Sequence, residues 1–85
     1  MSDLVTTLPN IGPRCAEWLA MIGVHTADDL REIGAPIAYR ELISRGIVKP
    51  HLMLLYALGG AVSGENCMNL SRERKRELEE AAGFV

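Results

Sequence analysis

The residues with the clearest chemical potential form a short turn, Leu8–Arg14 (LPNIGPR), which leads into an apolar run with helical spacing. Pro13 suits the first position of a helix, where its missing N–H would be unpaired in any case. The free amides at such a helix start point outward and attract anions, including phosphate. The turn therefore predicts a helix-hairpin-helix unit, and with a net charge of −2 the favoured interpretation is a turn that only joins two packed helices. The alternative is a turn that contacts a nucleic-acid backbone without reading its sequence. The candidate contact residues are then Asn10, Ile11, Gly12 and Arg14.

Other reactive side chains lack the partners that catalysis or metal binding needs. His25 and His51 have no Cys, Asp or Ser at a spacing typical of a catalytic triad or metal site. Cys15 and Cys67 do not form a CxxC motif. Two cysteines without that spacing are typical of reduced thiols in a cytosolic protein. No glycine-rich phosphate loop followed by lysine is present. We therefore predict a protein that is not an enzyme, with no catalytic residues, no metal and no cofactor.

Length and charge narrow the class of protein further. The 85 residues suffice for one domain, and 48% apolar residues is ordinary for a globular chain. A net charge of −2 argues against strong, non-specific binding to nucleic acid. The start Met1-Ser2-Asp3 lacks the basic and apolar regions of a signal peptide, and the apolar run 52–62 is too short to span a bilayer. We expect a cytoplasmic protein that is not attached to a membrane.

The turn needs helices to position it, and glycine and proline divide the chain into helical segments. Thr26 is expected to cap a helix with Asp29 completing a capping box, and Ser71 to cap the last helix. Gly23, Gly34 and Gly46 each follow a helix as its stop signal. The expected helices cover residues 2–8 (with Ser2 as cap), 13–22, 27–33, 36–45, 50–62 and 72–82. No segment shows sustained alternation of apolar and polar residues, so no sheet is expected.

The segment 52–62 has almost no polar face, so we predict a central helix that is buried all round. Gly59-Gly60 within it indicates either a close helix approach or a kink. In the helix 13–22, Cys15 and Trp18 are expected to face the core. In the last helix, the residues expected to face the core are Leu78, Ala81 and Ala82.

Several segments together resemble a known family. They are Leu8–Pro13, Trp18-Leu19, Ile22–Val24, Thr26–Leu30, Ile33–Ala35, Ala38-Tyr39, Leu54–Leu58 and Arg74-Lys75. Over nearly its whole length the chain is similar to the C-terminal domain of the TfoX/Sxy competence regulators. The resemblance implies an all-helical, helix-hairpin-helix or SAM-like domain from a bacterium. It also implies a family whose longer members regulate competence genes with help from a transcription factor.

The chain departs from this family at three points. The usual hairpin has glycine where Asn10 stands, although asparagine also adopts the left-handed conformation that a turn needs. The family tends to have tryptophan near the position of Cys67. The N-terminal domain of the longer members is not part of this sequence, so the chain is a candidate half of a split regulator.

We therefore expect residues 1–85 to form a single all-α domain, a small bundle of about five helices with a helix-hairpin-helix element. Its expected function is that of a non-enzymatic binding module in competence regulation. The expected partner is a protein, either a TfoX N-terminal domain or a transcription factor. The alternative is weak, non-sequence-specific binding to the DNA backbone through the hairpin turn. The oligomeric state stays open.

Overall fold

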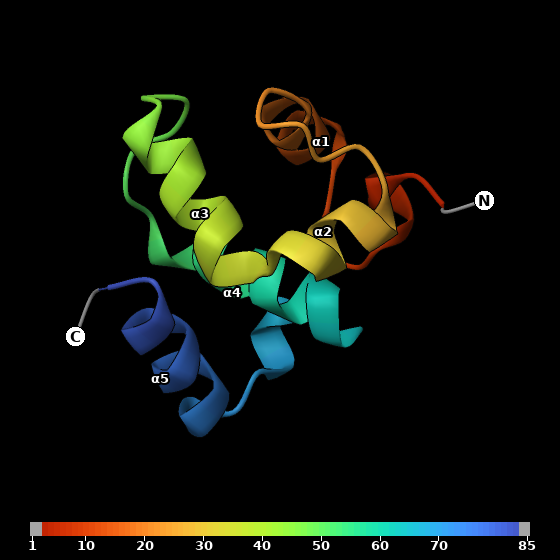
Figure 1. Cartoon of the computed structure of the whole chain (residues 1–85). Helices are drawn as coiled ribbons and strands as arrows, with labels where there is room; N and C mark the ends of the chain where they lie inside the picture. The colour runs from red at the N-terminus through yellow and green to blue at the C-terminus, as the bar shows by residue number, and fades with distance from the viewer. Residues whose placement is uncertain (1–2, 84–85) are drawn as a thin grey trace.

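The fold is a bundle of short helices around one central helix (Figure 1). It is seen in a computed structural model that describes residues 3–83. The elements in chain order are η1 (Val5–Thr7), α1 (Pro13–Ala20), α2 (Ala27–Ile33), α3 (Ala35–Ser44), α4 (Leu52–Ser63), η2 (Cys67–Asn69) and α5 (Arg72–Ala81), where η marks a 3-10 helix. Within residues 3–83, the one strand-like pairing is an isolated antiparallel bridge between Leu4 and Thr26. The predicted all-α class is confirmed.

The helix ends confirm the capping predictions. The Thr26 hydroxyl accepts a hydrogen bond from the Asp29 N–H at 3.1 Å, and the Asp29 carboxylate accepts one from the Thr26 N–H at 3.1 Å. The Ser71 hydroxyl caps α5 by accepting from the Arg74 N–H at 3.1 Å. Gly34, at φ 85°, both ends α2 and begins α3. This backbone conformation is costly for residues with a side chain, so the helix corner depends on glycine.

The central helix α4 packs against α3 and α5, as Figure 1 shows. Leu55 and Leu58 are fully buried in the core. A Cβ added at Gly59 would lie 2.8 Å from Cδ2 of Leu78, a core residue of α5. The predicted close helix approach at Gly59 is therefore confirmed, and α4 continues through it without a break.

The prediction that this helix is buried all round is wrong. Leu52 is 40% exposed and Met53 is 44% exposed in the first turn of α4. A chain of this size has a high ratio of surface to volume, so its helix ends reach the surface even where they are apolar. The helix also begins at Leu52 instead of Pro50, with His51 as its N-cap.

The predicted helix over residues 2–8 is also wrong in most of its length. Only Val5–Thr7 are helical, as a single 3-10 turn, while Leu4 is extended and 65% exposed. The backbone here bonds to a distant segment instead: the Val5 N–H donates to the His25 carbonyl at 3.1 Å. Tertiary pairing therefore overrides the weak local helical tendency of this stretch. Ser2, the predicted cap, lies outside the described residues.

Smaller differences concern helix ends and single side chains. The helix α1 ends at Ala20, two residues before the predicted end, and α5 ends at Ala81. Ala82 is buried as predicted, but Ala81 is exposed; consecutive residues lie about 100° apart around a helix, so only one of the two faces the core. Trp18 is only half-buried, although Cys15 on the same helix is buried. Within residues 3–83, no helix is long and apolar enough to cross a membrane.

Candidate functional site

The predicted hairpin is a turn between η1 and α1. Asn10 has a φ of 69°, in the left-handed region, so it does adopt the conformation that the turn requires. Gly12 is the N-cap of α1 and Pro13 is its first residue. Ile11 is buried, with 6% of its surface exposed, whereas Gly12 and Arg14 are exposed.

The side chain of Asn10 faces the interior and binds the turn to the region around the end of α4. Its amide Nδ2 donates to the carbonyl oxygens of Glu65, at 2.8 Å, and Ala57, at 3.3 Å. Its Oδ1 accepts from the Cys67 N–H at 3.0 Å. A Cβ added at Gly60 would lie 2.7 Å from the Asn10 amide nitrogen, so glycine there makes room for it. We call these contacts the Asn10 clamp.

The structure thus divides the predicted contact residues into two groups. Asn10 and Ile11 serve internal packing through their side chains, while Gly12 and Arg14 lie at the surface at the start of α1. Sequence reasoning missed the clamp. The signal that could have found it is the departure from glycine at Asn10 together with the paired glycines of the central helix.

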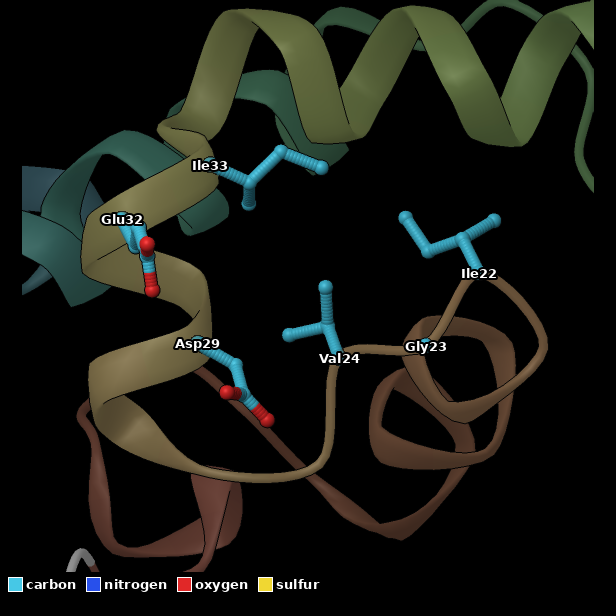
Figure 2. Close-up of a pocket in the computed structure, with 6 residues that line it drawn as sticks. All are labelled: Ile22, Gly23, Val24, Asp29, Glu32 and Ile33. Atoms are coloured by element: carbon cyan, nitrogen blue, oxygen red, sulfur yellow. The ribbon is translucent and has the colours of Figure 1, made fainter.

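An open hollow of about 240 Å³ lies between α2 and the loop that follows α1 (Figure 2). Figure 2 shows the side chains of Ile22 and Ile33 approaching it from opposite sides, with Val24 between them. The carboxylates of Asp29 and Glu32 lie along its edge. We call this the acidic hollow.

The carboxylate of Asp29 accepts hydrogen bonds from the protein backbone. The backbone N–H groups of His25 and Thr26 donate to it at 3.0 and 3.1 Å, and these bonds lower its pKa. Its negative charge is thus stabilised by the capping box. The group acts as a helix cap at the hollow's edge and is not poised for acid–base chemistry.

A second open hollow, of about 270 Å³, lies beside Trp18 of α1. We call it the Trp18 hollow. Its other lining residues come from the connection between α3 and α4 and from the start of α4; they are Ile47, Val48, Lys49, His51 and Leu54. Trp18, Ile47, Val48 and Leu54 are half-buried against the core, while Lys49 and His51 are exposed.

Two further groups have shifted pKa values, each with a structural cause. Burial raises the pKa of the Cys15 thiol to about 11. The hydroxyl of Tyr56 donates to the Glu79 carboxylate at 2.6 Å, which joins α4 to α5 and raises the pKa of the tyrosine. The Lys75 ammonium lies 5.3 Å from the centre of the same ring. Within the described part of the chain, no group of three His, Cys, Asp or Glu side chains could hold a metal ion.

Comparison with known proteins identifies the family. The sequence profile of the TfoX C-terminal domain matches residues 1–82. A crystal structure, in a triclinic form, of an uncharacterized protein from Listeria monocytogenes is similar, with a TM-score of 0.82 and 28% sequence identity over 94% of each chain. No curated protein matches this sequence. The chain therefore belongs to the TfoX C-terminal domain family, which indicates a regulatory domain.

Proposed function

We propose that this domain is a non-catalytic binding module that acts through a protein partner, such as a TfoX N-terminal domain or a transcription factor. The observation that carries the proposal is the Trp18 hollow, where half-buried apolar side chains from α1, from the α3–α4 connection and from α4 line a depression that is open to solvent. An apolar depression of this kind suits a projecting side chain of a protein partner, and tryptophan is enriched where binding energy concentrates in interfaces. Family membership supports the proposal independently.

The chemistry of the titratable groups is consistent with a non-catalytic role. The shifted pKa values belong to Cys15, Asp29 and Tyr56. Burial keeps the Cys15 thiol protonated, Asp29 caps a helix, and Tyr56 joins α4 to α5. Each shift therefore has a structural explanation that involves no reaction.

A second candidate function is weak binding to the DNA backbone through the hairpin. It is favoured by the exposed start of α1, where Gly12 has nothing within 4 Å of the position of a Cβ and Arg14 carries a positive charge. The net charge of −2 disfavours it. The Asn10 clamp leaves only Gly12 and Arg14 of the predicted set for such contacts.

Two titrations separate the candidates. Isothermal calorimetry with a separately expressed TfoX N-terminal domain is expected to show saturable binding. Fluorescence anisotropy with labelled duplex DNA at several salt concentrations is expected to show none. DNA binding that weakens with salt and loses about one unit of slope in Arg14→Ala, but not in the exposed control Arg40→Ala, would favour the second function.

A further inference from the structure

We propose that the Trp18 hollow receives an acidic, apolar segment of the partner protein. A large apolar side chain of that segment enters the hollow, and a carboxylate beside it pairs with the Lys49 ammonium at the edge. This inference rests on the proposed function and adds to it the location and the chemistry of the contact.

The apolar part of the hollow has the composition of an interface anchor point. Trp18 forms one wall, Ile47 and Val48 come from the α3–α4 connection, and Leu54 comes from α4. Tryptophan is among the residues most enriched where binding energy concentrates in protein interfaces. At about 270 Å³ the hollow lies just below the volumes of about 300–1,000 Å³ that are typical of small-molecule sites, and it is open to solvent. It suits a single projecting side chain.

The charge of the hollow favours a negatively charged partner. The exposed Lys49 ammonium lies at its edge, and none of its lining residues carries a carboxylate. Within residues 3–83, the Lys49 ammonium and the Trp18 indole N–H have no hydrogen-bond or ion-pair partner. Both are donors, so both are satisfied by carboxylate or carbonyl oxygens. The acidic hollow, edged by Asp29 and Glu32, has the opposite preference and serves as an internal comparison.

The hollow is held in shape before any partner arrives. The Ile47 N–H donates to the Leu42 carbonyl at 2.9 Å, and the His51 N–H donates to the hydroxyl of the buried Tyr39 at 2.6 Å. Arg45 also donates to the carbonyl of Met21, which ties the end of α3 to the end of α1. A rigid receptor loses little conformational entropy on binding, which favours affinity.

The first test is selection from a library of random peptides displayed on phage, with the whole chain as bait. Selected peptides are expected to carry Asp or Glu around a large apolar residue. Trp18 is the chain's only tryptophan, so its emission reports occupancy of the hollow directly. A synthetic copy of a selected peptide should shift that emission to shorter wavelength as it covers the ring.

Variants then locate the site by anisotropy titration of the labelled peptide. Trp18→Ala is expected to weaken binding at least about tenfold. Lys49→Glu changes an exposed side chain, leaves the core intact and is expected to weaken binding about fivefold or more through charge repulsion. Ile33→Ala, in the acidic hollow, is the matched control and should leave peptide affinity unchanged. Circular dichroism verifies that each variant is folded.

Some outcomes overturn the inference. It fails if no acidic peptide is selected, if the selected peptides are basic, or if Trp18→Ala and Lys49→Glu both bind as tightly as the wild type. Binding of the TfoX N-terminal domain that Lys49→Glu leaves unchanged would refute this docking site while the proposed function stands. The absence of any protein or peptide binding, together with salt-dependent DNA binding, would refute the proposed function itself.

Discussion

Replacing Asn10 tests whether its side chain fastens the hairpin to the rest of the fold. Asn10→Gly removes three hydrogen bonds, to the backbone of Ala57, Glu65 and Cys67. A hydrogen bond of this kind contributes about 1 kcal/mol net, and the bond to Glu65 is exposed and so worth less. Glycine adopts φ 69° with less strain than asparagine, which stabilises the folded state. Glycine also loses more conformational entropy on folding, and we expect these two contributions to the free energy of unfolding largely to offset each other. We expect a loss of about 2 kcal/mol in the free energy of unfolding.

Asn10→Ala separates the side-chain bonds from the backbone conformation. It loses the same three hydrogen bonds and also places a Cβ at a left-handed residue. We therefore expect it to be about 1 kcal/mol less stable than Asn10→Gly. Gly12→Ala is the matched control in the same turn, since Gly12 has a φ of −91° and open space around its Cβ position. Alanine is a poorer N-cap than glycine but loses less conformational entropy on folding, and because these two effects oppose each other this control should stay within about 0.5 kcal/mol of the wild type.

The assay is urea unfolding followed by circular dichroism, with thermal unfolding as a second measure. For a domain of this size, a loss of about 2 kcal/mol lowers Tm by about 10 °C. The slope of the free energy against urea concentration should not change if only the folded state is affected. An Asn10→Gly variant as stable as the wild type, or more stable, would show that the clamp contributes nothing and would refute this reasoning.

Three further predictions concern the core, a thiol and a helix cap. Leu55→Ala should lower the free energy of unfolding by about 2–5 kcal/mol, measured by urea titration, because this side chain is fully buried. With an aromatic disulfide reagent at about pH 8, the half-buried Cys67 should react before Cys15, whose buried thiol stays protonated with a pKa of about 11 and reacts only on unfolding. The pKa of Asp29 is lower in the folded state, so its contribution to stability is present above about pH 4 and is lost as the pH falls through the folded value. Asp29→Asn should make stability depend less on pH in this acidic range, as measured by the midpoint of urea unfolding at a series of pH values.

The parts of this fold that sequence predicts well depend on local chemistry. The Thr26 cap, the Ser71 cap and the corner at Gly34 each involve residues within a few positions of one another. A side-chain oxygen close to the first free amides, or a residue that tolerates positive φ, determines such a helix end. These signals act in the same way in any fold, so they can be read without knowing the tertiary structure.

The errors arise where burial or pairing depends on distant residues. Leu4 is extended because residues 3–5 pair with the backbone of residues 25–27, a contact with no local signature. Met53 and Trp18 are apolar residues on apolar helix faces, yet both reach the surface. A hydrophobic pattern shows which face of a helix avoids water, but the packing of the neighbouring helices determines how far that face is covered.

The candidate site illustrates the same limit in its chemistry. The sequence indicates that Asn10 occupies a turn position where glycine is usual, which leaves open whether its amide faces outward to a ligand or inward. The answer depends on Glu65 and Cys67, which are 55 and 57 residues away, and on the space left by Gly60. A buried or half-buried backbone N–H or carbonyl needs a partner, and the Asn10 amide supplies both a donor and an acceptor where glycine would supply neither. Asparagine at this position therefore stabilises the fold, but its amide oxygen and nitrogen are already hydrogen-bonded within the protein and are not available to a ligand. The Trp18 hollow, with the exposed Lys49 ammonium at its edge, therefore offers a partner more than the turn does.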